Sequence, residues 1–388
     1  MLVACFAGPH SQSWIDLIGD GEFEVRVLAT SVSDSAMYPP VPWRFPTYVL
    51  VRPYPERANA TIQSLVSGSP RLSPLVRRAI WYFPLQEKWW RRIIRSWKPK
   101  IIHCLSLRPV GVQVWHALRQ IPGDERPTLI VSSWGSEFHL ALDDPEQRGD
   151  LLDLLEDCDG FIGDCSRDIR AALSLGLRPE NLAFEHPIPV TGGVDIDQCA
   201  NAEVTVERRN LLVIPKAFEG ICNRTLPILE ALRSLADLLD GYEIHLMMCS
   251  ADVDRWLRRL PEGIRQRCVS HGRLPKTVVT DLLNRARVMI APSLCDGTPS
   301  VMLEAMTAGA LPLMSPVDSV EEWIDDRRNG LLAHALYPDK IALALRRALS
   351  DDELFYRAAR INRQIIAARC NRKAIHSEVV EYYERLMP

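Results

Sequence analysis

Residues 291–315 read APSLCDGTPSVMLEAMTAGALPLMS, and this stretch decides the predicted fold. An apolar strand runs into a turn at 296–299, which contains aspartate, glycine and proline. Ser300 is placed to cap a helix over about 301–308, and Gly309 is placed to end it. A further apolar strand follows. The segment therefore predicts the order strand, glycine turn, helix, strand.

The start of this predicted helix is a candidate phosphate site, because helix N-termini offer unpaired N–H groups and a positive dipole end. Asp296 lies just ahead of the helix and Glu304 lies one turn inside it. A carboxylate this close to a phosphate would be repelled by it, so both acids suit sugar hydroxyl groups better. The alternative is that Asp296 is only a turn residue and that Glu304 caps or pairs locally. Spacing alone favours this alternative, since short strand–turn–helix units are common.

Short apolar runs alternate with amphipathic segments along the whole chain. The predicted strands are 2–7, 23–29, 100–104, 128–132 and 160–163 in the first half, and 211–214, 243–248, 268–271, 288–291 and 311–314 in the second. The predicted helices include 14–18, 226–239 and 277–285. This alternation predicts an α/β protein with parallel sheets covered on both faces. Ligands would bind at the carboxyl ends of the strands.

The pattern restarts near residue 205, after an aperiodic stretch at 192–210 that we interpret as a linker. The chain has 388 residues, a length typical of two domains. The tail is predicted to be helical from Asp351, with 365–383 as one long packing helix.

Composition excludes several classes of protein. Lys and Arg total 46 against 49 for Asp and Glu, so the net charge of −3 gives no support to nucleic-acid binding. None of the ten cysteines forms a C-x-x-C pair, and we expect buried, reduced thiols in a reducing compartment. The N-terminus reads as a first strand rather than a signal peptide, and no apolar stretch approaches about 18 residues. We therefore expect a cytoplasmic protein.

The stretch D-G-T-P-S-V-M-L-E-A-M-T-A-G-A-L-P resembles the signature E-G-x-x-x-x-x-x-E-A-M-A-x-G-x-P of glycosyltransferase family 4. Segments 282–294 and 325–334 are also similar to that family, and 101–111, 133–138 and 186–197 resemble it more faintly. The resemblance implies the GT-B fold, an α/β fold with two doubly wound Rossmann-like domains facing an interdomain cleft. The acceptor-side domain would span 1–200 and the nucleotide-sugar domain 205–369. A C-terminal helix at about 370–388 could pack back on the first domain.

The resemblance also implies roles for individual residues. Glu304 would hold the ribose hydroxyls, and Asp296, where the family has glutamate, would contact the donor sugar near the reacting carbon. A basic pair, Lys216 and Arg224, would hold the diphosphate, although the usual glycine–arginine start is absent and both residues could instead be solvated surface charges. The donor site is completed by four residues of the turn and helix start: Gly297, Thr298, Pro299 and Ser300.

The resemblance further implies a retaining, metal-independent hexosyltransferase-type enzyme of polysaccharide biosynthesis, with no cofactor. It would move a sugar from a nucleotide-diphosphate donor to a glycan, lipid-linked or small-molecule acceptor. Fixed cations and helix amides would stabilise the leaving diphosphate. Two alternatives remain: a nucleotide-sugar epimerase of the same fold, and a catalytically silent binding or activator subunit.

Candidates in the first half are less specific. Gly8, His10 and Ser11 follow the first strand and are predicted to contact donor phosphate or acceptor, although many strand–helix turns look alike. Trp134 is a further candidate for the acceptor or phosphate loop, but it stands where many family members carry a histidine, so no catalytic histidine is assigned. Glu137 and His139 could line the acceptor site or be ordinary surface residues. His103 and His186 are interpreted as structural.

Residues 77–100 read RRAIWYFPLQEKWWRRIIRSWKPK, with eight basic residues, one acidic residue and four tryptophans. This composition suits peripheral contact with an anionic membrane at its inner face, where rings and charges meet the headgroups. Docking of an amphipathic helix on the first domain explains it equally well. Binding of single-stranded nucleic acid is the least favoured explanation. Membrane contact would make a lipid-linked acceptor plausible.

Overall fold

The computed structural model describes residues 1–5, 8–19, 21, 23–29, 45–51, 62–66, 85–142, 144–199, 205 and 209–387. The chain divides into two compact units. Unit 1 comprises Met1–Gly192 and Ala374–Pro388, and unit 2 comprises Gly193–Lys373. The division therefore falls earlier than the expected boundary between 200 and 205, and the last helix belongs largely to unit 1.

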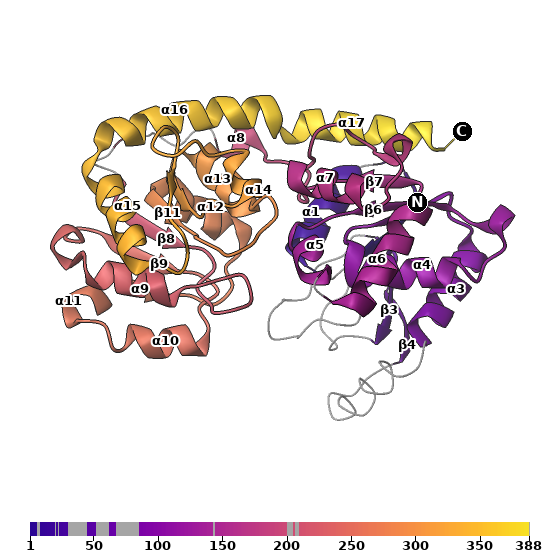
Figure 1. The fold of residues 1–388 in the computed structure, drawn as a ribbon, viewed down its shortest axis with the longest axis horizontal. Coiled ribbons are helices and arrows are strands. Elements are labelled where there is room, and N and C mark those ends of the chain that lie inside the picture. The colour runs from indigo at the N-terminus through magenta and orange to yellow at the C-terminus, as the bar shows by residue number, and fades with distance from the viewer. Residues whose placement is uncertain are drawn as a thin grey trace. The chain divides into compact units, whose positions relative to one another are not determined.

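Unit 1 is built on a seven-stranded sheet in the order β4-β3-β2-β1-β5-β6-β7 (Figure 1). All neighbouring strands are parallel. The strands are β1 (Leu2–Cys5), β2 (Arg26–Ala29), β3 (Thr47–Val51), β4 (Ile62–Val66), β5 (Ile101–Cys104), β6 (Thr128–Ser132) and β7 (Gly160–Ile162). The helices are α1 (Pro9–Ile18), α3 (Leu85–Trp97), α4 (Val112–Leu118), α5 (Ser136–Ala141), α6 (Pro145–Asp157) and α7 (Ser166–Ser174).

The central strand β1 shows why this sheet is covered on both faces. All four of its residues are buried. Leu2 and Ala4 join the core cluster that contains α3, α4 and α6, whereas Val3 and Cys5 join the cluster that contains α1 and the C-terminal helix. Successive side chains of a strand point to opposite faces, so a continuous apolar run requires helices on both.

Unit 2 contains a six-stranded parallel sheet in the order β10-β9-β8-β11-β12-β13. The strands are β8 (Leu211–Ile214), β9 (Glu243–Leu246), β10 (Cys268–Ser270), β11 (Ala286–Ile290), β12 (Leu311–Met314) and β13 (Leu331–Leu332). The helices are α8 (Ile196–Cys199), α9 (Leu226–Arg233), α10 (Ala251–Leu257), α11 (Glu262–Arg265), α12 (Lys276–Arg285), α13 (Ser300–Ala308), α14 (Asp318–Glu321), α15 (Pro338–Ser350) and α16 (Asp352–Arg369). Both sheets have the doubly wound architecture that the alternating pattern predicts.

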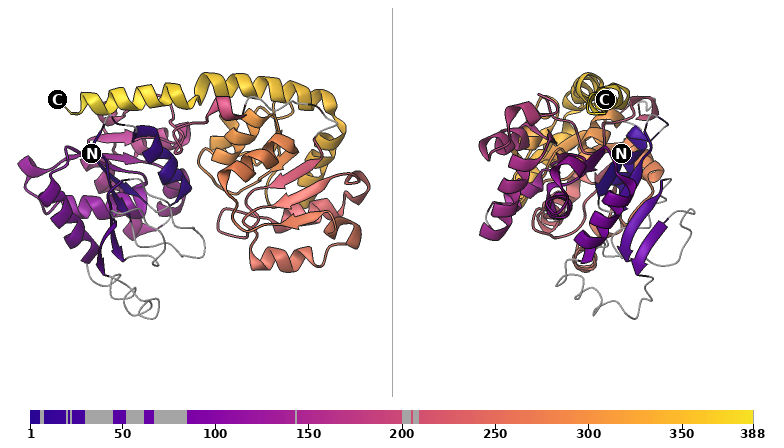
Figure 2. Two further views of the ribbon diagram at one scale, coloured as in Figure 1. Left: turned by 180° about the vertical axis from the view of Figure 1, so that it is seen from behind. Right: turned by 90° about the vertical axis from the view of Figure 1, so that its right-hand side faces the viewer.

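Several sequence-based expectations need correction. Strands β3 and β4, at the edge of the first sheet (Figure 2), and β13 were not predicted. The predicted helix 226–239 stops at Arg233, and a short 3₁₀ turn follows it. Ser300 is the first residue of α13 and does not cap it, because Pro299 occupies the N-cap position. Gly309 ends that helix as predicted, with a left-handed φ of 81° that favours glycine.

The tail is also different from the single helix predicted over 365–383. Helix α16 ends at Arg369, and α17 (Arg372–Arg385) begins after a break. The break has a hydrogen-bonding reason: Val194 forms a parallel bridge with Asn371, and its amide donates to the carbonyl of Cys370 at 2.9 Å. The two places where the chain passes from one unit to the other therefore lie next to each other in the fold.

Helix α3 carries most of the Trp-rich basic segment; residues 77–84 lie outside the described part of the chain. Trp90 is buried, and Trp89 and Trp97 pack against the core of unit 1. The basic residues Lys88, Arg92 and Arg95 are exposed. The described tryptophans thus support docking of this helix on unit 1. Within the described residues, no helix has the length and apolar character that crossing a membrane requires.

Candidate functional site

Two loops meet at the carboxyl ends of β8 and β11, which are parallel neighbours in unit 2. The β8 loop comprises residues 215–225, and the β11 loop comprises residues 291–299. The amide of Leu294 donates to the carbonyl of Cys222 at 2.8 Å, and Asn223 forms an antiparallel bridge with Ser293. Backbone contacts therefore hold the two loops side by side where ligands bind in doubly wound sheets.

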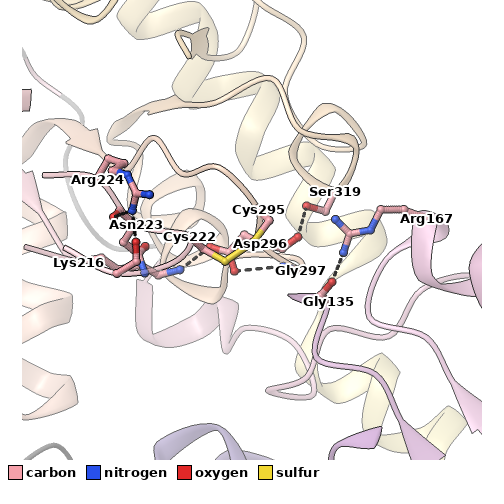
Figure 3. Close-up of a disulfide and its surroundings, with 11 residues drawn as sticks. Gly135, Arg167, Lys216, Cys222, Asn223, Arg224, Cys295, Asp296, Gly297 and Ser319 are labelled. Carbon is pink, nitrogen blue, oxygen red and sulfur yellow. Dashed lines mark hydrogen bonds and ion pairs between the residues drawn. A yellow bond between two sulfur atoms is a disulfide. The ribbon is translucent and has the colours of Figure 1, made fainter. Parts of the chain in front are cut away.

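Lys216 and Asp296 join the same loops through their side chains, which form an ion pair (Figure 3). Both side chains are partly buried. A carboxylate oxygen of Asp296 also accepts from the amide of Gly297 at 3.1 Å, and its backbone carbonyl accepts from the hydroxyl of Ser319 at 2.8 Å. Asp296 is therefore held in place within the β11 loop, and its carboxylate is paired with the ammonium of Lys216.

Arg224, the second predicted diphosphate ligand, lies on the β8 loop but folds back on it (Figure 3). Its guanidinium donates to the carbonyl of Asn223 at 2.9 Å and to the carbonyl of Gly220. The structure thus brings Lys216 to Asp296, whereas the guanidinium of Arg224 bonds to its own loop. Both cations nevertheless lie on one loop, between the end of β8 and the start of α9.

The start of α9 fixes the shape of the β8 loop. The carboxylate of Glu219 accepts from the amides of Thr225 and Leu226 at 2.5 Å and 2.8 Å, where an anion is stabilised by the helix dipole. The hydroxyl of Thr225 donates to the carbonyl of Lys216 at 3.2 Å. The backbone that carries Lys216 is consequently anchored to a helix end.

Helix α13 begins directly after the β11 loop. Gly297, Thr298 and Pro299 are buried and Ser300 is half-buried. The first amides of any helix have no acceptor within it, so this start offers donors to an anion. The other end of the helix is held by the buried Arg209, which donates to the carbonyl of Ala308 at 2.8 Å. Among the described residues, no three His, Cys, Asp or Glu side chains form a group that could hold a metal ion.

Glu304 points from α13 toward α12 rather than pairing within its own helix. Its carboxylate lies 3.0 Å from the ammonium of Lys276, the first residue of α12. The Lys276 side chain is largely exposed, whereas that of Glu304 is mostly buried. Sequence reasoning missed Lys276, because nothing in its local pattern distinguishes it from an ordinary surface lysine.

A disulfide between Cys222 and Cys295 adds a covalent link between the two loops (Figure 3). The Cα atoms of the pair are 5.1 Å apart, within the range that a disulfide spans. This pair corrects the expectation of reduced thiols at Cys222 and Cys295. Each cysteine lies in the loop after a predicted strand, but the sequence carries no local signal that these two strands are neighbours.

The first-domain candidates gather loosely at the end of β1. Gly8 precedes α1 in an extended conformation, His10 is exposed and Ser11 is fully buried. The ring of His10 lies 6.0 Å from that of Trp134 in an edge-on arrangement. The structure thus brings His10 and Trp134 together, whereas Ser11 faces the interior of unit 1.

Glu137, in the first turn of α5, anchors the loops that follow β5 and β6. Its carboxylate accepts from the amides of Arg108 and Trp134 at 2.9 Å and 2.7 Å. Burial raises the pKa of Glu137 to about 8, and the charge of Asp168 adds to this rise in smaller measure. The two hydrogen bonds lower the pKa, but by less than burial raises it. Its oxygens are therefore used to shape the loops, while His139 stays on the surface.

His103 is held in the interior of unit 1, whereas His186 lies on its surface. His103 is fully buried and bonds to Ser132 and to Tyr383 of α17, each at 2.7 Å. Burial lowers the pKa of His103 to about 3, so the imidazole is neutral at physiological pH. His186 is exposed and lies 3.1 Å from Glu378.

Comparisons with known proteins agree with this architecture. Residues 222–351 match the family model described as Glycosyl transferases group 1. An uncharacterised glycosyltransferase of Methanocaldococcus jannaschii is 30% identical over 123 residues, which cover 31% of this chain and 32% of that protein. The matched part of the chain thus spans about a third of that relative's length.

Two solved structures are similar over nearly the whole chain. Anabaena HepE, solved in complex with UDP and glucose, has a TM-score of 0.70 at 13% identity, with 99% of this chain and 100% of that one covered. Sucrose-phosphate synthase from Thermosynechococcus elongatus has a TM-score of 0.71 at 15% identity, with 100% and 99% covered. The chain therefore has the GT-B fold of these structures, and its residues 222–351 match the Glycosyl transferases group 1 family.

Proposed function

We propose that this protein is a glycosyltransferase that moves a sugar from a nucleotide-diphosphate donor to an acceptor. One observation carries the proposal: a segment that matches the Glycosyl transferases group 1 family contains paired loops with Lys216, Asp296 and the start of α13 at one sheet edge. In open α/β sheets this edge is the ligand-binding edge. Donor binding is assigned to unit 2.

The proposed donor site divides by charge. The first amides of α13 and the cations Lys216 and Arg224 would hold the diphosphate, because the leaving group gains negative charge in the transition state. Asp296 and Glu304 would accept hydrogen bonds from hydroxyls of the sugar and of the ribose. Anabaena HepE was solved with UDP and glucose bound, so a uridine nucleotide is the first donor class to test.

The details of the reaction, the donor and the acceptor that we propose follow the resemblance to glycosyltransferase family 4. The bond between the anomeric carbon and the diphosphate breaks, the acceptor hydroxyl forms the new bond and gives its proton to the leaving diphosphate oxygen, and the anomeric configuration is retained. We propose that this transfer needs neither a metal nor a cofactor, and that the donor is a hexose nucleotide. The acceptor is a glycan, a lipid-linked molecule or a small molecule bound on unit 1, and the reaction belongs to polysaccharide biosynthesis.

A cytoplasmic location at the inner membrane face is part of the proposal. The exposed basic residues of α3 would meet anionic lipid headgroups while its tryptophans stay in the core of unit 1. A pelleting assay with vesicles of phosphatidylglycerol against vesicles of phosphatidylcholine tests this contact. Equal recovery of the protein with both vesicles would exclude it.

A second candidate function is a catalytically silent subunit that binds nucleotide and acts through a partner. The ion pair between Lys216 and Asp296 favours it, since the acid proposed to grip the sugar already holds a cation. Asp296 is also one methylene shorter than the family's glutamate.

The decisive experiment has two stages. Thermal unfolding is measured with UDP, GDP, ADP and their glucose derivatives, because a ligand that binds only the folded state raises the unfolding temperature. The nucleotide sugar that gives the largest shift is then incubated with the protein, and free sugar and nucleotide are quantified. Binding with release of free sugar supports the transferase, binding without release supports the silent subunit, and no shift with any nucleotide would contradict both.

A further inference from the structure

The disulfide between Cys222 and Cys295 lies inside the proposed donor site. Cys222 stands two residues before Arg224, and Cys295 stands directly before Asp296. The bridge therefore ties the loop with the proposed diphosphate cations to the loop with the sugar-binding acid. The two cysteines are 73 residues apart in sequence.

The disulfide adds a covalent link to the non-covalent contacts between the β8 and β11 loops. These contacts are the backbone bond from Leu294 to Cys222, the antiparallel bridge between Asn223 and Ser293, and the ion pair between Lys216 and Asp296. All of them are reversible. The ion pair is partly exposed, and such a pair contributes little. Without the disulfide, the backbone contacts would therefore carry most of the task of holding the two loops in register.

The remaining cysteines behave differently. Five of the seven free cysteines in the described structure are buried, and the other two, Cys249 and Cys268, are half-buried without a bridge. The described structure thus pairs two thiols at the proposed site, and the seven other cysteines that it describes are not disulfide-bonded. In reducing compartments such an isolated bridge is usually transient and redox-sensing rather than structural.

We propose that Cys222 and Cys295 form a reversible dithiol–disulfide pair that sets the affinity of unit 2 for nucleotide. This inference rests on the proposed function, because it assumes that the two loops bind a nucleoside diphosphate. The oxidised form holds both loops in register before the ligand arrives, so binding does not have to order them. Reduction frees the β8 loop and weakens binding.

The exchange reaction is a two-electron step. The thiolate of an external dithiol attacks the half-buried sulfur of Cys222, the S–S bond breaks, and the sulfur of Cys295 leaves as a thiolate that takes up a proton. The second thiol of the reductant then displaces Cys222, which also ends as a thiol. The protein gains two electrons and two protons, and the dithiol becomes a disulfide.

The test compares the full-length protein after mild oxidation with the same protein after treatment with excess dithiothreitol. Alkylation in denaturant followed by mass spectrometry counts free thiols, and we expect two more in the reduced form. Titration calorimetry with UDP, GDP and ADP should give a dissociation constant about five- to tenfold higher after reduction for whichever nucleotide binds. Hydrogen exchange should show faster exchange of amides in the β8 loop.

Matched variants separate this bridge from general thiol effects. The double variant Cys222→Ser/Cys295→Ser should bind like the reduced protein under both conditions, whereas Cys249→Ser/Cys268→Ser should keep the full redox response. Equal affinity in the two verified redox states, or failure of the bridge to form under oxidant, would overturn the inference and leave the proposed function intact. A third outcome is that no nucleotide binds in either redox state, although hydrogen exchange of the β8-loop amides still changes on reduction. In that case the proposed function fails, and the proposed effect of the disulfide on nucleotide affinity fails with it.

Discussion

The ammonium of Lys276 lies 3.0 Å from a carboxylate oxygen of Glu304, and this pair joins the start of α12 to the first turns of α13. The lysine side chain is 67% exposed, so the pair stabilises the fold by about 1 kcal/mol at most. The main consequence of the pair is the orientation of the Glu304 carboxylate. Lys276 fixes the direction of the carboxylate that we propose to hold the ribose of the donor.

Replacing Glu304 tests that role directly. Glu304→Ala removes an ionised acceptor of two hydroxyl hydrogen bonds, each worth about 1.5–3 kcal/mol, so nucleotide affinity should fall at least about tenfold. Sugar transfer should be abolished. Calorimetry with UDP and with 2′-deoxy-UDP should show that the variant no longer distinguishes the two ligands.

Glu353→Ala is the control for this substitution. Glu353 is an exposed helical glutamate of unit 2 that pairs with Arg357, and its loss should leave nucleotide affinity unchanged. Near-normal turnover by Glu304→Ala would remove Glu304 from the donor site.

Lys216 should contribute to binding of the diphosphate rather than of the nucleoside. Lys216→Ala removes a charge-assisted contact, and UDP affinity should fall about tenfold while uridine affinity is unchanged. Fluorescence competition with both ligands measures the difference. Lys340→Ala, an exposed lysine on α15, is the control. Equal losses for UDP and uridine would show that the substitution acts through the loop and not through the phosphates.

The regular parts of the fold could be predicted because they depend on local patterns. Strands β8 and β11 are short apolar runs with turn residues after them, and Gly309 ends α13 with the backbone conformation that glycine alone adopts easily. The elements β8, β11 and α13 could therefore be predicted from local signals. The edge strands β3 and β4 escaped prediction because the stretch around them carries many prolines and charges.

The candidate site was predictable only in outline. The sequence places Lys216, Asp296 and Glu304 near strand ends, since each follows a clear strand or helix signal. Which of these side chains contact one another depends on the order of the strands in the sheet, and that order is a property of the tertiary structure. The pairing of Cys222 with Cys295, and of Lys276 with Glu304, follows from β8 lying beside β11 and α12 lying beside α13. Neither neighbour relation is encoded locally.

The hydroxyl of Tyr383 should be essential for anchoring α17 on unit 1. It bonds to buried His103 at 2.7 Å and accepts from the indole of Trp14 at 3.2 Å. Tyr383→Phe removes the partner of the Trp14 indole and of Nδ1 of His103 in the core, and should cost about 1–3 kcal/mol of stability. Thermal unfolding measures the loss, with Tyr356→Phe at an exposed site as the control. An unchanged unfolding temperature would show that the network adds nothing.

Glu137 should make stability depend on pH. Burial raises the pKa of its carboxyl from 4.5 to about 8 in the folded protein, so between these values the folded state holds a proton that the unfolded state has lost. Stability contributed by the protonated form is complete below pH 4.5 and is lost as pH rises through 8.

Glu137→Gln cannot lose this proton, so its stability should not show that fall. As pH rises from about 5 to about 8, the unfolding temperature of the natural protein should therefore fall relative to that of the variant. Differential scanning calorimetry across that range measures it. Glu180→Gln, at an exposed site of the same unit, should track the natural protein at every pH. A difference for Glu137→Gln that stays constant with pH would mean that the carboxyl is ionised throughout, held by the amides of Arg108 and Trp134.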